Sequence, residues 1–364
     1  MTTQTDTLPE EIEGLDDDQD TSWGDYPIDE LLIRNESPPI EQVLGRIQQG
    51  RYVMDPDFQR DFIWDETKQS KLVESVLMRI PLPVFYLAED AQGRRIVVDG
   101  LQRLSTFRRF AENELRLNLP DRCDLHRKRY EDLDPKLQDR FGDFSLTLYV
   151  IDAKAPDQTR LDIFERVNSG VPLTRQQMRN CLYMGEATRF LRKQSKTKLF
   201  LDATGRSLRT ATMRDREFIN RFCAFQILRL EGYRDMDDFL ASGLKKMNSE
   251  PELLPPLSEQ LKTTLDNNLH LFGRHAFRKH EPDQDYRNVI NASLWDVMST
   301  GLSRYPSRIV EKRSTDVREG FYQLLEDENF ADSITYGTSA VRQVRNRFAM
   351  TQAMLKDVLG AYQG

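Results

Sequence analysis

Residues 96–107 read IVVDGLQRLSTF, a run that passes from apolar residues through Asp99-Gly100 into a segment with helical spacing. The apolar residues before the turn suit a buried strand, and Gly100 allows a backbone conformation that a side chain disfavours. The apolar residues after the turn recur at the spacing of one helix face. The stretch therefore predicts a buried strand that turns sharply into a helix at about residues 101–113.

The turn at Asp99 is a candidate anion site. Asp99 can cap the first amides of the helix, and those amides, with the positive end of the helix dipole, attract anions. Arg103 falls near the helix start, at the edge of its core-facing side, where its guanidinium can bind phosphate oxygens. A purely structural interpretation also fits these residues: a strand-turn-helix capped by Asp99, with Arg103 paired to a carboxylate.

A second Gln-Arg pair precedes this turn. The sequence DPDFQRDFIW at residues 55–64 places Gln59 and Arg60 among aromatic residues, just after the strand-like run RYVMDP. The aromatic residues also suit a core. Gln102 and Arg103 likewise follow a strand-like run. If the two strands are neighbours, two arginines and two amides converge on one pocket.

A third segment, IFERVNSGVPLTRQQMRN at residues 163–180, predicts two helices joined by an elbow. Gly170 suits the end of the first helix, and Thr174 suits the cap of the second. Capping does not explain Arg166 and Arg179 so readily. The polar residues gathered around the elbow are Arg166, Asn168, Arg175, Arg179 and Asn180.

The order of elements along the 364 residues favours two domains. Up to Asp152, single helices separate short strands, which is typical of a compact α+β domain. Beyond it, strand patterns nearly vanish and helical periodicity continues. We therefore expect a disordered acidic tail at residues 1–22, an α+β domain at 23–152 and a mainly α-helical domain at 153–364. Helical patterns in the last part fit about 156–167, 174–193, 213–231, 257–272, 287–303, 307–327 and 339–361.

Charge is distributed unevenly along the chain. Residues 1–20 contain eight acidic residues and no base, whereas thirteen Lys and Arg face four acidic residues between Arg175 and Arg229. Such a basic excess attracts nucleic acid, although solvated helix faces explain it as well. The acidic tail is either a competitor for this basic surface or an aid to solubility. The candidate DNA-binding residues are Arg175, Arg179, Arg189, Arg192 and Lys193.

Several protein classes lack their usual signatures in this sequence. No stretch approaches the roughly 20 apolar residues of a membrane helix, and the N-terminus has no secretory signal pattern. The three cysteines form no CxxC pair, so neither a disulfide framework nor a cysteine zinc site is expected, and a reducing cytoplasm is the expected location. The histidines lack metal-ligand spacing, and no GxxxxGK[ST] phosphate loop occurs.

The three segments together resemble the N-terminal domain of GmrSD-type restriction endonucleases, a prokaryotic family related in fold to ParB and sulfiredoxin. The shared pattern consists of Gln59-Arg60 with Trp64, the IPLP run at 80–83, the DGLQRLST run at 99–106, and Phe164 to Asn180. It extends from about residue 40 to beyond residue 300. Two positions depart from the family: Leu101 replaces the common Gln, and Gln177 replaces the usual acidic residue. A sulfiredoxin-type reduction is set aside, because it needs a cysteine in the turn.

The resemblance implies nucleotide binding, often with slow hydrolysis, coupled to recognition of foreign or modified DNA in phage defence. By analogy Asp99 orients a water molecule or Mg²⁺, Gln102 and Arg103 hold phosphates, and Asp99, Gln102 and Arg103 form the catalytic group. Positioning and charge neutralisation supply most of such catalysis. The implied nucleotide-binding residues are Gln59, Arg60, Gly100, Ser105, Thr106, Arg166 and Asn168.

We therefore expect a sensor or regulator that binds a nucleoside triphosphate with Mg²⁺ and hydrolyses it weakly. Many relatives fuse an HNH-type nuclease to this domain, and because this sequence shows no such histidine motif, we expect any effector nuclease to be a separate polypeptide. Two alternatives stay open. One is a DNA-binding module whose turn at Asp99 is purely structural, and the other is a standalone DNA endonuclease.

Overall fold

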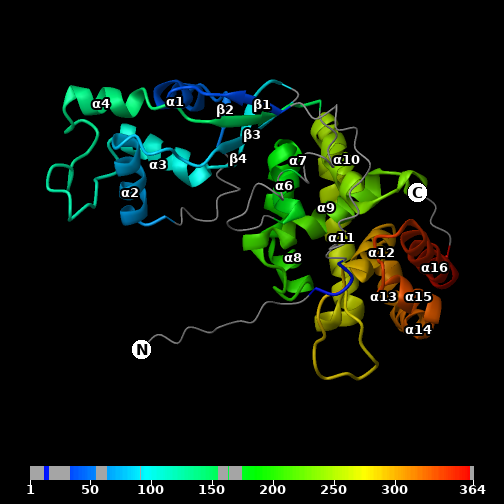
Figure 1. The fold of residues 1–364 in the computed structure, drawn as a ribbon. Coiled ribbons are helices and arrows are strands. Elements are labelled where there is room, and N and C mark those ends of the chain that lie inside the picture. Colours follow the sequence, from blue (N-terminus) through cyan, green and yellow to red (C-terminus); the bar gives the residue numbers. More distant parts are fainter. Residues whose placement is uncertain are drawn as a thin grey trace, which may run out of the picture. The chain divides into compact units, whose positions relative to one another are not determined.

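A computed structural model describes residues 12–15, 33–54, 64–90, 92–154, 163 and 174–360. The chain divides into two compact units. Unit 2 spans Trp23–Leu182, and unit 1 combines Met1–Ser22 with Tyr183–Gly364. Along the chain, unit 2 is therefore an insertion between the first segment of unit 1 and the rest of it (Figure 1).

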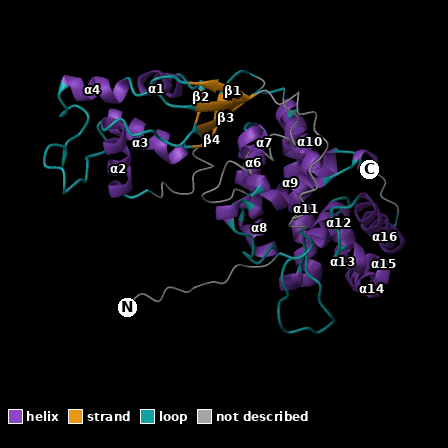
Figure 2. Cartoon of the chain, in the orientation of Figure 1, coloured by secondary structure: helices purple, strands orange, loops and turns teal. Residues whose placement is uncertain are grey.

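Unit 2 contains a mixed five-stranded sheet in the order β1-β5-β3-β4-β2 (Figure 2). β1 pairs with β5 and β3 with β4 in antiparallel fashion, whereas β3–β5 and β2–β4 are parallel. The mixed order follows from single helices inserted between short strands. The strands are β1 (Ile33–Glu36), β2 (Tyr52–Val53), β3 (Phe85–Glu89), β4 (Arg95–Asp99) and β5 (Leu148–Ile151).

Helices of unit 2 pack with this sheet around one hydrophobic core. α2 begins at Asp65, whose side chain accepts a hydrogen bond from the amide of Lys68 at 2.7 Å. Its apolar residues face inward, as the helical spacing predicts. Phe110 and Phe141 join α3 to α4 edge to face, with ring centroids 5.3 Å apart. The helices described are α1 (Ile40–Gln48), α2 (Glu66–Leu77), α3 (Leu101–Ala111), α4 (Pro135–Gly142) and α6 (Arg175–Leu182).

From Tyr183 onward, the described residues form helices that are joined by loops. In α11, Leu257, Leu261 and Leu265 are buried at intervals of four residues, as their spacing predicts. Short 3-10 helices occupy Thr210–Thr212, Leu230–Gly232, Pro251–Leu253 and Gly273–His275. The α-helices are α7 (Glu186–Ser195), α8 (Lys198–Ala203), α9 (Arg214–Ile227), α10 (Met236–Ser249), α11 (Leu254–Phe272), α12 (Ala292–Leu302), α13 (Ser307–Lys312), α14 (Ser314–Glu326), α15 (Glu328–Ser333) and α16 (Val341–Leu359).

A buried charge cluster joins three helices at the centre of unit 1. Arg221 of α9 donates from Nε and Nη2 to the two carboxylate oxygens of Asp296, at 2.8 and 2.7 Å. Arg347 of α16 donates to the same carboxylate at 2.9 Å. Burial lowers the pKa of Arg347; at Arg221 burial acts in the same direction, but Asp296 outweighs it and the pKa is raised. One carboxylate therefore serves two guanidinium groups inside the protein.

The predicted fold class is confirmed, because a small mixed sheet with helices is followed by a mainly helical part. The helices differ from the prediction in several places; α8 and α15, for example, form where none was predicted. The pattern at 174–193 divides into α6 and α7, since Gly185 caps α7 and a side chain there would meet Asn248. The pattern at 307–327 divides into α13 and α14 at Arg313. α10 forms where no helix was predicted. Within the described part of the chain, no helix has the length and apolarity needed to cross a membrane.

Candidate functional site

The turn between β4 and α3 forms as the sequence predicts. Gly100 has φ +99°, the left-handed region that favours glycine. A Cβ at this position would lie 2.2 Å from Cδ1 of Phe85, so the ring beneath the turn also excludes a side chain. Glycine at residue 100 is therefore required by backbone conformation and by space.

The predicted cap of α3 is wrong. No side chain accepts a hydrogen bond from the first turn of α3 in the described structure. The Asp99 carboxylate instead accepts a hydrogen bond from Nη2 of Arg103 at 2.8 Å. Because Arg103 lies four residues further along, the ion pair draws Asp99 along the helix side and away from the amides. The first-turn amides of α3 are left without a side-chain acceptor.

Arg103 is held by protein groups on several sides. The residue is only 8% exposed. Besides Asp99, its guanidinium donates to the carbonyl oxygen of Val84 at 3.0 Å and to that of Pro83. Its Cζ lies 4.1 Å from the ring centroid of Phe85, within the range of a cation–π contact. Burial lowers the pKa of Arg103, and the Asp99 carboxylate opposes this shift.

This arrangement matches the structural interpretation of Arg103. The guanidinium ties the carbonyls at 83 and 84 to the turn at Asp99, so the IPLP and DGLQR motifs support each other. In this arrangement Arg103 positions the turn. Asp99 remains 36% exposed in its side chain and stays accessible from solvent.

Two polar side chains on α3 lack partners among the described residues. Oε1 of Gln102 and Oγ of Ser105 are buried without a hydrogen bond, and Ser105 is 2% exposed. The two residues are three apart, so they lie on the same side of the helix. Thr106, in contrast, donates to the carbonyl oxygen of Gln102 at 2.8 Å. Buried polar atoms normally have partners, so Gln102 and Ser105 mark a side of α3 that suits a polar ligand.

β2 and β4 are neighbours, which is the condition on which the predicted pocket depends. They pair in parallel, with Tyr52 opposite Arg95 and Val53 opposite Ile96. Parallel neighbours end at the same edge of a sheet. The chain that follows β2 and the turn that follows β4 therefore start from one edge. Gln59 and Arg60 lie outside the described residues, so their contacts stay a prediction.

The third motif segment reaches the same strand through α6, which packs against β4. In α6, Arg179 donates from Nε to Oε1 of Gln176 at 3.1 Å, and Gln176 donates to Asn180 at 3.0 Å. These side chains are buried within unit 2. Arg166 and Asn168 lie outside the described residues. β4, which leads into the second motif segment, is therefore in contact with β2, which precedes the first segment, and with α6, which contains the end of the third.

Gln177 has a defined structural role at the start of α6. The amide of Gln177 donates to Oγ1 of Thr174 at 3.2 Å, and the amide of Thr174 donates to Oε1 of Gln177 at 2.8 Å. This reciprocal pair is a capping box, in which Gln and Glu are interchangeable. The predicted cap at Thr174 is confirmed. The position needs an acceptor oxygen, which either residue type supplies.

The predicted metal ligand, Asp99, belongs to no group of three or more possible metal ligands among the described residues. Across the described ranges, no three His, Cys, Asp or Glu side chains are placed to hold a metal ion. One carboxylate fits Mg²⁺ only when phosphate oxygens and water complete the coordination. A Mg²⁺ ion at this turn would therefore depend on the nucleotide.

The predicted DNA-binding residues divide between the two units. Arg179 is 1% exposed and Arg175 is half-buried, both on α6 of unit 2. Arg189, Arg192 and Lys193 are exposed on α7 of unit 1, where Arg189 pairs with Glu186 at 2.5 Å. Of the five predicted residues, those on α7 are therefore the more exposed to solvent.

Sequence reasoning missed the supports of the turn. No sequence pattern singles out Phe85, yet its ring lies under both Gly100 and Arg103. The carbonyl oxygens at Pro83 and Val84 carry no sequence signal of their own. The IPLP motif beside a strand was the available indication, because it fixes where these carbonyls point.

Comparison with known protein families agrees with this geometry. The family model described as GmrSD restriction endonuclease, N-terminal domain, matches residues 40–184. That range begins at α1 and ends just beyond α6, so it contains the turn at Asp99 and the three motif segments. A search of the curated proteins finds no match to the chain. Residues 40–184 of this chain are therefore similar to the N-terminal domain of the GmrSD restriction endonucleases.

Proposed function

We propose that unit 2 binds a nucleoside triphosphate at the sheet edge where β2 and β4 end, as the sensor of a prokaryotic restriction or phage-defence system. The parallel pairing of β2 with β4 carries this proposal. It means that Gln59-Arg60 and Gln102-Arg103 follow neighbouring parallel strands, of which β2 ends at Val53 opposite Ile96 and β4 continues to Asp99. The family match to a restriction endonuclease domain supplies the biological setting.

The phosphates bind at the start of α3 in this proposal. The first-turn amides have no side-chain cap, and they lie at the positive end of an 11-residue helix. Gly100 lets the phosphate approach the backbone closely. Gln102 offers an unpartnered carboxamide oxygen for a ribose hydroxyl and an amide group for a phosphate oxygen.

Arg103 and Asp99 take separate roles. Arg103 holds the turn in place through Asp99 and two carbonyl oxygens. The positive charges for the phosphates then come from Arg60 and Arg166, whose positions stay a prediction. Asp99, with part of its carboxylate exposed, orients the attacking water in slow hydrolysis. That water attacks the terminal phosphorus, and the nucleoside diphosphate leaves.

Nucleotide binding is expected to raise the melting temperature of the full chain. A panel of ATP, GTP, CTP and UTP with Mg²⁺ identifies the base, because a ligand that binds only the folded state stabilises it. Gln102→Ala is expected to weaken binding about three- to tenfold, the usual effect of losing one hydrogen-bonding group. Arg108→Ala is the matched control, since Arg108 is an exposed residue on the same helix. Equal losses of nucleotide affinity in Gln102→Ala and Arg108→Ala would contradict the role of Gln102.

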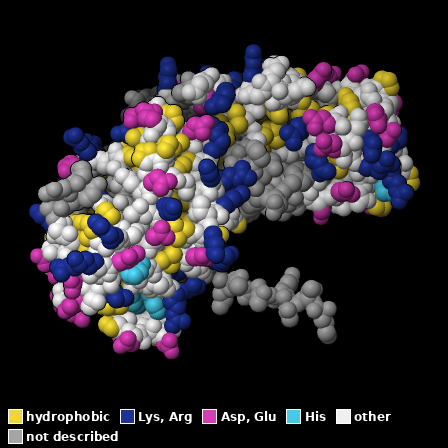
Figure 3. All heavy atoms as spheres, turned by 180° about the vertical axis from the view of Figure 1, so that it is seen from behind, with side chains coloured by type: hydrophobic (Ala, Val, Ile, Leu, Met, Phe, Trp, Pro, Cys, Tyr) yellow, Lys and Arg dark blue, Asp and Glu magenta, His cyan; other side chains and the backbone are white. Residues whose placement is uncertain are grey.

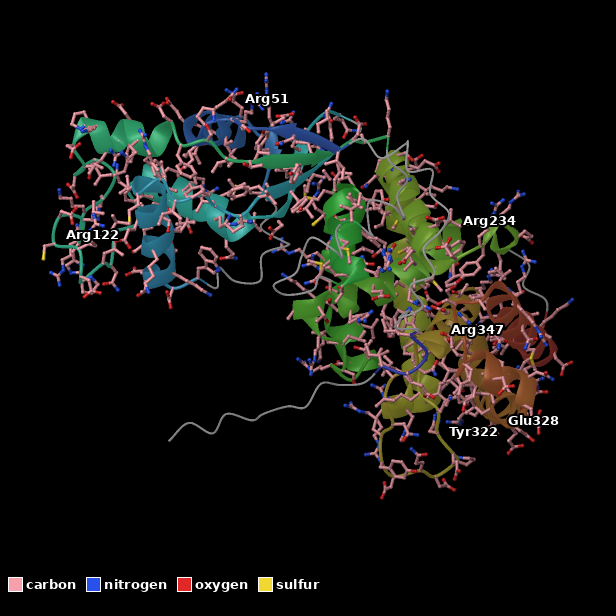
Figure 4. All side chains as sticks on the ribbon, viewed as in Figure 1. Arg51, Arg122, Arg234, Tyr322, Glu328 and Arg347 are labelled. Carbon is pink, nitrogen blue, oxygen red and sulfur yellow. The ribbon has the colours of Figure 1, made fainter. Side chains whose placement is uncertain are left out.

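Arg60→Ala tests the predicted cation. We expect roughly a 10–100-fold loss of nucleotide affinity, because a charge-assisted hydrogen bond to phosphate is removed. Arg51→Ala is the control, as Arg51 is exposed at the other end of β2 and points away from the protein (Figure 4). Unchanged affinity in Arg60→Ala, measured by calorimetry, would remove the proposed pocket. Phosphate release measured in parallel separates binding from hydrolysis.

Binding of DNA by unit 1 is a second candidate function, favoured by one exposed basic surface. Lys and Arg side chains gather along the flank of unit 1 that carries α7 and α8 (Figure 3). Glu186 and Asp202 are the acidic residues in this stretch, and Glu186 is paired with Arg189. The exposed basic residues of this surface are Arg192, Lys193, Lys196, Lys198, Arg206 and Arg209.

Neutralising part of this surface is expected to weaken DNA binding. The variant Arg192→Gln/Lys193→Gln removes two charges. The negative slope of log affinity against log salt concentration is therefore expected to become less steep by roughly 1.8. Arg308→Gln/Lys312→Gln, on α13, is the control with two exposed charges elsewhere on unit 1. Fluorescence anisotropy with duplex DNA at several salt concentrations measures both. Identical slopes in the two variants would show that α7 does not contact DNA.

A further inference from the structure

A groove on unit 1 holds residues 12–15 of the same chain. Glu13 forms a parallel β-bridge with Asn291. The amide of Glu13 donates to the carbonyl oxygen of Ile290 at 3.1 Å, and the amide of Ala292 donates to the carbonyl oxygen of Glu13 at 2.8 Å. Figure 1 shows this short dark-blue segment beside the helices of the C-terminal part. The segment is therefore attached by one β-bridge to the residues that precede α12.

The Glu13 side chain is bound by a lysine in the groove. Nζ of Lys279 donates to Oε1 of Glu13 at 2.5 Å and to Oγ1 of Thr335 at 2.6 Å. On the other side, Oγ1 of the buried Thr338 donates to the carbonyl oxygen of Gly14 at 2.8 Å. The groove thus contacts both the carboxylate and the backbone of the segment.

Gly14 fits a position that other residues would fill badly. Its φ is +73°, in the left-handed region. A Cβ there would lie 3.1 Å from Oδ1 of Asn291 and 3.2 Å from both Oγ of Ser293 and the carbonyl oxygen of Ile334. A side chain at this position meets polar atoms on three sides. The groove therefore selects glycine directly after glutamate.

The walls of the groove are fixed by the core of unit 1. Asn291 is fully buried, caps α12 through the amide of Leu294 at 2.8 Å, and donates to the carbonyl oxygen of Ile334 at 3.0 Å. The loop on the other side is held by Arg347 (Figure 4), which donates to the carbonyl oxygen of Thr338. None of these contacts involves residues 12–15. The receptor side is preorganised, which favours binding.

We infer that this groove is a peptide-recognition site for a short segment with glutamate followed by a glycine in the left-handed conformation, and that residues 12–15 occupy it in cis. Recognition combines backbone hydrogen bonds at Ile290 and Ala292, which any sequence can make, with the Lys279 contact, which requires an acidic side chain. Because the segment belongs to the same chain, its effective concentration is high. A peptide of the same chemistry therefore enters only when the cis segment is released.

A labelled peptide of residues 8–20, LPEEIEGLDDDQD, tests this inference on the full chain. Gly14→Val in the chain releases the cis segment, because the left-handed conformation becomes strained and the site too small. We expect the peptide to bind the Gly14→Val chain and to bind the unsubstituted chain roughly tenfold or more weakly. Hydrogen exchange at the Ala292 amide reports whether the cis segment has left. A Glu13→Lys chain provides a second route to release, since lysine then faces Lys279.

The controls separate recognition from non-specific binding. Peptides carrying Gly14→Val or Glu13→Lys are expected to bind neither chain, and Lys279→Met in the Gly14→Val background is expected to weaken the native peptide. Equal peptide binding to the released and unsubstituted chains would overturn the inference. So would failure of the peptide to bind a chain in which Ala292 exchanges freely. Unchanged exchange in both release variants would show that the groove does not select Glu-Gly.

Discussion

Asp296→Ala is expected to lower the free energy of unfolding of unit 1 by about 3–5 kcal/mol, the usual cost of removing one partner from a buried ion pair. The side chain is fully buried, and both Arg221 and Arg347 depend on it. Without the carboxylate, two guanidinium groups remain in the interior and lose their hydrogen-bonded countercharge. Hydrogen exchange in α12 and α16 measures the effect within unit 1 and avoids assuming that both units unfold together.

Asp316→Ala is the control for this prediction. Asp316 pairs with Arg313 at 3.2 Å, but its side chain is 47% exposed, so the exposed pair contributes less than about 1 kcal/mol. A difference between the two variants isolates the effect of burial. If Asp296→Ala lost no more stability than Asp316→Ala, the cluster would not be an essential part of the core.

Gly100→Ala is expected to destabilise unit 2 by roughly 2–5 kcal/mol, the sum of left-handed strain and overpacking. The added Cβ would collide with Phe85, whose ring also supports Arg103. The substitution should therefore displace the turn and reduce nucleotide binding together with stability. Hydrogen exchange in β4 and α3 measures the loss of stability, and calorimetry measures the loss of nucleotide binding.

Gly50→Ala separates the two causes. Gly50 also has positive φ, at +69°, but no other group lies within 4 Å of the position that a Cβ would take, so only strain is added. We expect a loss of about 1–2 kcal/mol there. Similar losses at both glycines would mean that Phe85 yields easily and that the ring does not define the turn.

Local patterns predicted local structure well. The strand, the glycine and the helix around residue 100 follow from neighbouring residues, and so does the cap at Thr174. The partners of Arg103 could not be predicted in the same way. Its acceptors at Pro83 and Val84 are 20 and 19 residues away, and only the folded β3–β4 hairpin brings them close. The choice between a phosphate ligand and a structural arginine therefore depended on distant backbone.

The sequence alone could not show that β2 and β4 are neighbours, because strand order depends on the whole sheet. Residues 12–15 have structural contacts that their composition does not predict. Their composition predicts disorder, yet the contacts of Glu13 and Gly14 are with residues near 290 and 338. No local pattern reveals such a partner. The acidic composition of residues 1–20 gives no indication that a short segment within them binds to unit 1.

The insertion of unit 2 into unit 1 sets an order of events during protein synthesis. Gly14 leaves the ribosome early, whereas Thr338, its hydrogen-bond donor, is 324 residues later in the chain. At translation rates of 5–20 residues per second, the segment waits roughly 16–65 s for its groove to exist. Unit 2 is complete before then and can fold first. Docking of residues 12–15 is consequently a late step in maturation, and a nascent chain that stalls before α12 leaves this segment without its binding site.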